Sequence, residues 1–169
     1  ATIPVINALT DLTHPCQALA DLQTIRENRD TVKGTTVTFL GDGNNVVNSL
    51  ILGCSMLGID LKLGCPEGYD PDPRFLKEGI SRAEKSGGSV RLLRDPGEAC
   101  RGAHFLYTDV WTSMGQEEES KKRIKDLAAY QLNADRLNDA ASDAKILHCL
   151  PAHRSEEITD ELMEHPRSV

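Results

Sequence analysis

The sequence predicts an α/β fold, an open three-layer α/β/α sandwich built on a parallel, Rossmann-like sheet. Three observations support this prediction. Short runs rich in β-branched and aromatic residues alternate along the chain with segments of helical apolar spacing. The stretch 36–58, TVTFLGDGNNVVNSLILGCSMLG, has the pattern of a strand, a glycine-bearing turn and a buried helix. The length of 169 residues is typical of one domain with its own core.

The turn inside this stretch is the first candidate site. Gly41 and Gly43 permit a sharp turn and close backbone approach. Asn44 and Asn45 follow where a helix must begin, and asparagine is a good helix cap. Because ligands of open α/β sheets sit outside the carboxyl ends of the strands, Asp42, Asn44 and Asn45 are candidate ligand contacts.

The other elements follow in order and alternate in type. Strands are expected over 60–65, 89–93, 104–110 and 145–150, and helices over 15–29, 73–85, 96–100, 117–127, 133–140 and 156–164. Pro15 and Pro73 suit the first turn of their helices. The charged run 117–125 is interpreted as a solvated helix face, since its acidic residues precede basic ones by four positions.

Composition excludes several classes of function. A net charge of −7 argues against a general nucleic-acid binder, and no apolar run approaches the ~20 residues of a membrane span. No secretion signal is visible. The five cysteines are odd in number and lack C-x-x-C spacing, which predicts neither disulfides nor zinc. A reduced compartment is expected, either cytoplasmic or organellar.

The GDGNNV motif at 41–46 has more than one interpretation. It resembles the dinucleotide fingerprint G-x-G-x-x-G, but Val46 replaces the third glycine. One reading is a plain tight turn between a strand and a helix. The other is a non-catalytic nucleotide-binding module, and a truncated relative that binds nothing is a third possibility.

Two further motifs carry polar side chains. In HPCQ, His14 and Gln17 precede or open a helix and could face an anionic ligand, or His14 could be a solvated capping residue. In DVWTSMG, Asp109 follows a strand end and could bind an amine, while Ser113 could bind a carboxylate. The alternative is a surface turn with Trp111 in the core.

The HCLP motif at 148–151 places a cysteine at the end of a strand. A thiolate at Cys149 would need a nearby cation. His148 and His153 lie close in sequence, but without a third ligand at useful spacing no metal site is expected. The remaining cysteines are expected to be inert core residues, namely Cys16, Cys54, Cys65 and Cys100.

Taken together, HPCQ, GDGNN, DVWTSMGQEEE and HCLP, in this order and at these separations, closely resemble the ornithine carbamoyltransferases. The resemblance covers essentially the whole chain, and HCLP and the SMG loop are similar to the ornithine rather than the aspartate enzymes. It implies that residues 1–169 are the carboxyl-terminal, ornithine-binding domain. The amino-terminal carbamoyl-phosphate domain and the final helix would then be absent, in keeping with the abrupt ends of the chain.

The resemblance also implies a reaction and the residues that bind ornithine. Carbamoyl phosphate and L-ornithine would give L-citrulline and phosphate, as in arginine biosynthesis or the urea cycle, without any cofactor. The δ-amine of ornithine would attack directly. The family's ornithine contacts match Asn45, Asp109, Ser113 and Met114, with Asp109 holding the α-ammonium group.

The carbamoyl-phosphate contacts implied by the resemblance are His14, Gln17, Cys149 and Leu150. Cys149, paired with Asp109, would orient ornithine and help take up a proton from its δ-ammonium group. The family's phosphate-binding segment, S-T-R-T-R, occurs nowhere in this sequence. A full-length enzyme of this kind would be a homotrimer joined mainly through the other domain. The isolated chain is therefore expected to be inactive.

Overall fold

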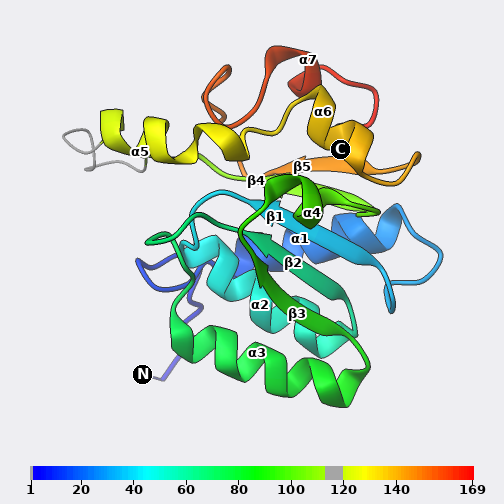
Figure 1. Cartoon of the computed structure of the whole chain (residues 1–169). Helices are drawn as coiled ribbons and strands as arrows, with labels where there is room; N and C mark the ends of the chain where they lie inside the picture. Colours follow the sequence, from blue (N-terminus) through cyan, green and yellow to red (C-terminus); the bar gives the residue numbers. More distant parts are fainter. Residues whose placement is uncertain (1, 113–119) are drawn as a thin grey trace.

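The computed structural model describes residues 2–112 and 120–169, and it confirms the predicted α/β class (Figure 1). Five strands form a single parallel sheet. They are β1 (Thr36–Leu40), β2 (Asp60–Gly64), β3 (Ser89–Leu93), β4 (Phe105–Thr108) and β5 (Lys145–His148). No helix among these residues is long and apolar enough to cross a membrane.

The strand order, β3-β2-β1-β4-β5, creates a topological switch point. From β1 the chain adds β2 and β3 on one side and then β4 and β5 on the other. Val37 of β1 lies in register with Leu61 of β2 and with Phe105 of β4. The connections after β1 and β4 therefore diverge, and the carboxyl ends of these two strands are where ligands of such sheets bind.

Helices cover both faces of the sheet (Figure 1). The α-helices are α1 (Pro15–Glu27), α2 (Asn45–Leu57), α3 (Pro73–Ser86), α4 (Pro96–Cys100), α5 (Ser120–Leu127), α6 (Ala134–Asp139) and α7 (Asp160–Met163), and Ala128–Tyr130 is a 3₁₀ turn. On the face of α1, α2 and α3, the buried strand residues include Phe39 and Tyr107. Leu40, Leu106 and Ile146 belong to the core of the other face. Neighbouring strand residues thus point to opposite layers, as the pleat requires.

The turn between β1 and α2 has the predicted caps. The Asn44 side chain accepts hydrogen bonds from the backbone N–H groups of Val46 and Val47, at 3.0 and 3.2 Å. Gly58 ends the helix in the left-handed conformation, with φ of 71°. Val46, which replaces the third fingerprint glycine, is buried in the core.

Three sequence predictions were wrong in detail. The last helix covers only Asp160–Met163 instead of 156–164, because Ser155 has a left-handed φ of 70° and the next residues turn. Cys16 is exposed on α1, not in the core. In the charged run, whose residues 117–119 lie outside the described part, the lysines are exposed as predicted, but Arg123 is buried where it pairs with Asp42. The other three cysteines predicted to be inert are buried, and burial raises their thiol pKa values to about 12.

Gly43 provides a stability test of the β1–α2 turn. A Cβ atom at this position would lie 2.2 Å from the backbone nitrogen of Pro71, so the loop would have to move. We expect Gly43→Ala to lower the free energy of unfolding by about 3 kcal/mol, the upper range for overpacking. Urea denaturation followed by circular dichroism measures this change.

Gly97→Ala is the matched control for this substitution. Its Cβ would approach the end of the flexible Arg136 side chain, at 2.7 Å, in the first turn of α4. Alanine also favours the helix, so this variant should stay within about 1 kcal/mol of the wild type. Equal urea midpoints for Gly43→Ala and the wild type would contradict the close-packing argument.

Candidate functional site

Asp109 is the centre of a polar cluster at the switch point. It follows β4 directly and is only 8% exposed. Its Oδ1 accepts hydrogen bonds from the backbone N–H of Val110, at 2.7 Å, and from the Cys149 thiol, at 2.8 Å. Its Oδ2 accepts one from Asn44 Nδ2, at 2.6 Å. The carboxylate thus joins the ends of β4 and β5 to the turn after β1.

The surroundings of Cys149 favour its thiol form. Burial and the neighbouring Asp109 carboxylate raise the pKa of Cys149 far above the usual value of a thiol. Each cause disfavours a negative charge on the sulfur, so the proton stays on Sγ and the thiol donates to Asp109. A thiolate nucleophile needs the opposite environment, a nearby cation. This geometry therefore favours a hydrogen-bonding role for Cys149.

A second polar chain connects α1 to the sheet beneath this cluster. The Tyr107 hydroxyl donates to Asp21 Oδ2, and Gln17 Nε2 donates to Asp21 Oδ1, both at 2.9 Å. Burial raises the pKa of Asp21. Tyr107 lies on β4 two residues before Asp109, and alternate residues of a strand point to the same face. This chain therefore places Gln17 on the side of the sheet that carries the cluster.

His14 and Asn45, two further predicted site residues, contact the segment before α1. His14 donates its backbone N–H to Ser49 Oγ, and its Nδ1 lies 2.9 Å from the carbonyl oxygen of Ala8. Asn45 Nδ2 donates to the carbonyl oxygen of Thr10, at 2.7 Å. These bonds hold the loop before α1 against the start of α2. Ser113 and Met114 lie outside the described residues.

The geometry does not favour nucleotide binding at GDGNN. The N–H of Gly43 donates to the Tyr69 carbonyl, at 2.9 Å, and those of Val46 and Val47 donate to Asn44. A phosphate at a helix start needs such N–H groups free. Asp42 is also engaged, since its carboxylate pairs with Arg123. These backbone N–H groups and the carboxylate of this motif are therefore already bonded within the fold.

Some residues of the cluster escaped the sequence prediction. Asn44 was expected to cap α2 or touch a ligand, and its bond to Asp109 across 65 positions has no sequence signal. Asp21 does have one, because it lies four residues after Gln17 on the same helix face. Trp111 is buried, as the alternative reading of its motif predicted.

A group of potential metal ligands lies nearby. The side chains of His153, Glu156 and Glu157 each bring one ligand atom within 4.8 Å of the others. Glu157 Oε1, however, already accepts hydrogen bonds from His148 and from the backbone of His153. The His153 and Glu156 side chains are 3.6 Å apart, the geometry of a loose ion pair. Hydrogen bonds thus engage Glu157 Oε1, whereas Glu157 Oε2 is buried without a hydrogen-bond partner among the described residues.

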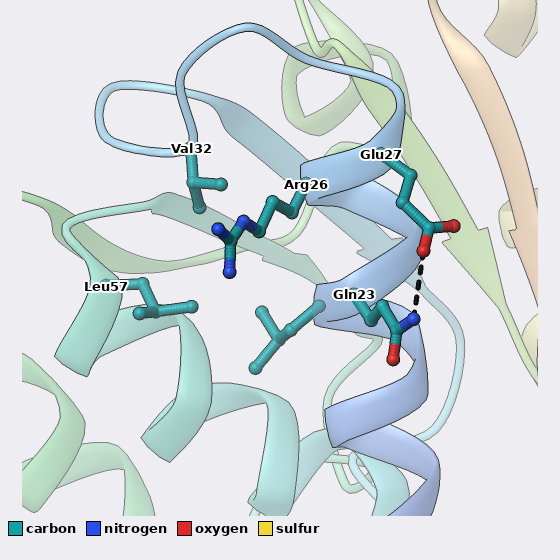
Figure 2. Close-up of a pocket in the computed structure, with 6 residues that line it drawn as sticks. Gln23, Arg26, Glu27, Val32 and Leu57 are labelled. Carbon is teal, nitrogen blue, oxygen red and sulfur yellow. Dashed lines mark hydrogen bonds between the residues drawn. The ribbon is translucent and has the colours of Figure 1, made fainter.

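A cavity of about 650 Å³ lies elsewhere, between α1 and α2 (Figure 2). It is lined by Leu22, Gln23, Arg26, Glu27, Val32 and Leu57. Leu57 ends α2, which begins at the carboxyl edge of β1 and runs back, so this cavity lies toward the amino edge of the strands. Its Gln23 and Glu27 side chains bond to each other, at 2.9 Å. The cavity is therefore separate from the Asp109 cluster.

The fold and the cluster define an open parallel α/β domain with a polar site at its switch point. Residues 33–169 match the family model described as "Aspartate/ornithine carbamoyltransferase, Asp/Orn binding domain", and residues 1–27 match the family's "carbamoyl-P binding domain". The chain belongs to the aspartate/ornithine carbamoyltransferase family.

Known relatives are similar along almost the entire chain. An ornithine carbamoyltransferase of Gloeobacter violaceus is 57% identical over 168 residues, which are 99% of this chain and 54% of the relative. An anabolic ornithine carbamoyltransferase of Pyrococcus furiosus is 50% identical over 169 residues, which are 100% of this chain and 54% of the relative. The chain thus spans about half the length of the curated relatives it matches.

Solved structures of the same two enzymes confirm the fold. The Pyrococcus furiosus enzyme superposes with a TM-score of 0.96 at 50% identity, over 100% of this chain and 54% of that one. The Gloeobacter violaceus enzyme gives a TM-score of 0.91 at 54% identity, over 98% of this chain and 55% of that one.

Proposed function

We propose that this chain is the ornithine-binding part of an ornithine carbamoyltransferase, which transfers the carbamoyl group of carbamoyl phosphate to the δ-amine of L-ornithine. The observation that carries the proposal is the Asp109 carboxylate, held at the switch point by Cys149 and Asn44. The similarity of the chain to ornithine carbamoyltransferases supports it. Residues 1–27, which match the other domain's model, would begin the connection to that domain.

Asp109 is suited to bind an ammonium group. Its Oδ1 accepts two hydrogen bonds from the protein, whereas Oδ2 accepts one from Asn44, which leaves capacity for a further donor. A charge-assisted bond from the α-ammonium of ornithine would fill that capacity. In this proposal, Asn45 binds the zwitterionic end of ornithine, and the backbone of Ser113 and Met114 binds its carboxylate.

The proposed reaction needs a neutral δ-amine. The δ-ammonium group first passes a proton to Cys149 Sγ while the thiol passes its own proton to Asp109 Oδ1, along the hydrogen bond that already joins these two groups. The nitrogen lone pair then attacks the carbamoyl carbon to form the new C–N bond. The bond from that carbon to the phosphate oxygen breaks, and inorganic phosphate leaves with the electron pair. No cofactor enters these steps.

The carbamoyl group would be held by residues from two segments. His14 and Gln17 at the start of α1 polarise its carbonyl as negative charge develops on the oxygen. Cys149 and Leu150 contact it from the end of β5.

In this proposal, the complete enzyme is a homotrimer of the cytoplasm, or of the mitochondrial matrix in an animal. It serves arginine biosynthesis or a urea-cycle step.

Titration of the purified chain tests this function against the nucleotide alternative. Because closure of two domains strengthens substrate contacts, we expect weak binding of L-ornithine, with a Kd of about 1 mM or above. In ¹H–¹⁵N NMR spectra, ornithine should shift the backbone signals of Asn44, Asp109 and Val110, while NAD at the same concentration should leave them unchanged. Shifts with NAD and none with ornithine would reject the proposal.

A further inference from the structure

A buried histidine–carboxylate pair lies directly behind the proposed site. His148 is the last residue of β5, and its side chain is 4% exposed. Its Nε2 lies 3.0 Å from Oε1 of Glu157, whose side chain is fully buried. The same oxygen accepts the backbone N–H of His153, at 2.6 Å. A carboxylate buried this deeply is costly unless such donors hold it.

The contact at the other ring nitrogen of His148 identifies which tautomer is present. The backbone N–H of Leu150 lies 2.9 Å from His148 Nδ1. A backbone N–H can only donate, so Nδ1 must be the acceptor, and the ring hydrogen must be on Nε2. That hydrogen points to Glu157. The imidazole is therefore neutral and held in one tautomer by a partner at each nitrogen.

Leu150 needs this support because of its backbone conformation. Its φ is +54°, a left-handed conformation that is unfavourable for an L-residue other than glycine. The Leu150 side chain is 60% exposed, so core packing contributes little to holding it. The hydrogen bond to His148 is a restraint directly at the strained residue. It also fixes the peptide between Leu150 and Cys149, whose thiol meets Asp109.

Glu157 is itself anchored by the rest of the fold. Its backbone carbonyl accepts the N–H of Leu132, at 2.8 Å, and the adjacent Ile158 forms bridges with Leu132 and Arg154. Ile158 is fully buried in the core on the same face of the sheet as Leu40 and Leu106. The carboxylate therefore sits on a rigid segment and can hold the end of β5 in place.

We propose that Glu157 and His148 are positioning residues for the carbamoyl-transfer reaction. Glu157 selects the Nε2–H tautomer of His148, and this tautomer holds the Leu150 amide so that Cys149 and Leu150 face the substrates. This inference rests on the proposed function, because the Asp109–Cys149 cluster is the site that the pair serves. Neither residue touches a substrate.

The first test measures the tautomer of His148 in the wild-type chain, without substrate. Long-range ¹H–¹⁵N correlations of the imidazole rings at pH 7 should show a neutral His148 protonated at Nε2. Glu157→Gln keeps a carbonyl acceptor for both N–H donors, so it should keep this tautomer and the Leu150 amide signal. Glu157→Leu removes the acceptor and should give mixed tautomers. An Nδ1–H tautomer or an imidazolium in the wild type overturns the inference, whether or not the variants fold.

The second test measures kcat and the KM for ornithine in a full-length enzyme that contains this domain. Loss of positioning should lower kcat about tenfold or more in Glu157→Leu and change the KM for ornithine less than about threefold, whereas Glu157→Gln should stay near wild type. Equal kcat values for Glu157→Leu and the wild type would reject the positioning role. Failure of ornithine to bind the wild-type chain would instead reject the proposed function, and the tautomer measurement would be unaffected.

Discussion

The purified chain of 169 residues should fold and yet form no measurable citrulline from carbamoyl phosphate and L-ornithine. Carbamoyl phosphate carries most of its charge on the phosphate, and the S-T-R-T-R segment that would clamp it is absent from the sequence. His14 and Gln17 offer no guanidinium for bidentate phosphate binding. Without the clamp the carbonyl carbon is not positioned, and positioning can supply roughly 7–11 kcal/mol of barrier reduction.

The assay is a citrulline measurement on the purified chain, with circular dichroism to confirm that it is folded. Folding is expected because helices cover both faces of the sheet and two large cores are buried. The matched positive control is the same chain joined to a carbamoyl-phosphate domain, which should restore turnover. Citrulline formation by the isolated chain at a rate near that of the joined enzyme would mean that it contains an unrecognised phosphate site.

Asp109→Asn in a full-length enzyme should weaken ornithine binding strongly. The substitution removes the charge that would hold the α-ammonium group, and an amide nitrogen on the side of Oδ2 would face Asn44 Nδ2 donor to donor. A hydrogen bond to a charged group contributes about 1.5–3 kcal/mol. The KM for ornithine should therefore rise roughly 10- to 150-fold, since each 1.4 kcal/mol is a factor of ten. Steady-state kinetics at saturating carbamoyl phosphate measures this change.

Asp135→Asn supplies the control for that experiment. Asp135 is exposed in the first turn of α6, so the same chemical change there should leave KM and kcat within about twofold, as is usual for surface positions. Thermal unfolding of both variants checks that the fold is intact. If Asp109→Asn kept wild-type values of KM and kcat, Asp109 would have no role in ornithine binding.

The sequence by itself determined the order and type of the elements, because the signals involved are local. Prolines at helix starts, Asn44 at the cap of α2 and Gly58 at its end act within a few residues, and all have the predicted roles. The parallel sheet followed from the alternation of strands and helices. The motif order along the chain was also sufficient to indicate the family.

Only the tertiary structure decided which polar groups meet and which are buried. Asn44 and Cys149 reach Asp109 across 65 and 40 positions, because parallel strands bring distant chain segments to one edge of the sheet. Arg123 appeared solvated in its charged run but is buried against Asp42. Glu157 lay within a predicted helix, and its burial beside His148 depends on long-range packing. Local sequence patterns do not encode contacts of this kind, because burial is set by the elements that pack from other parts of the chain.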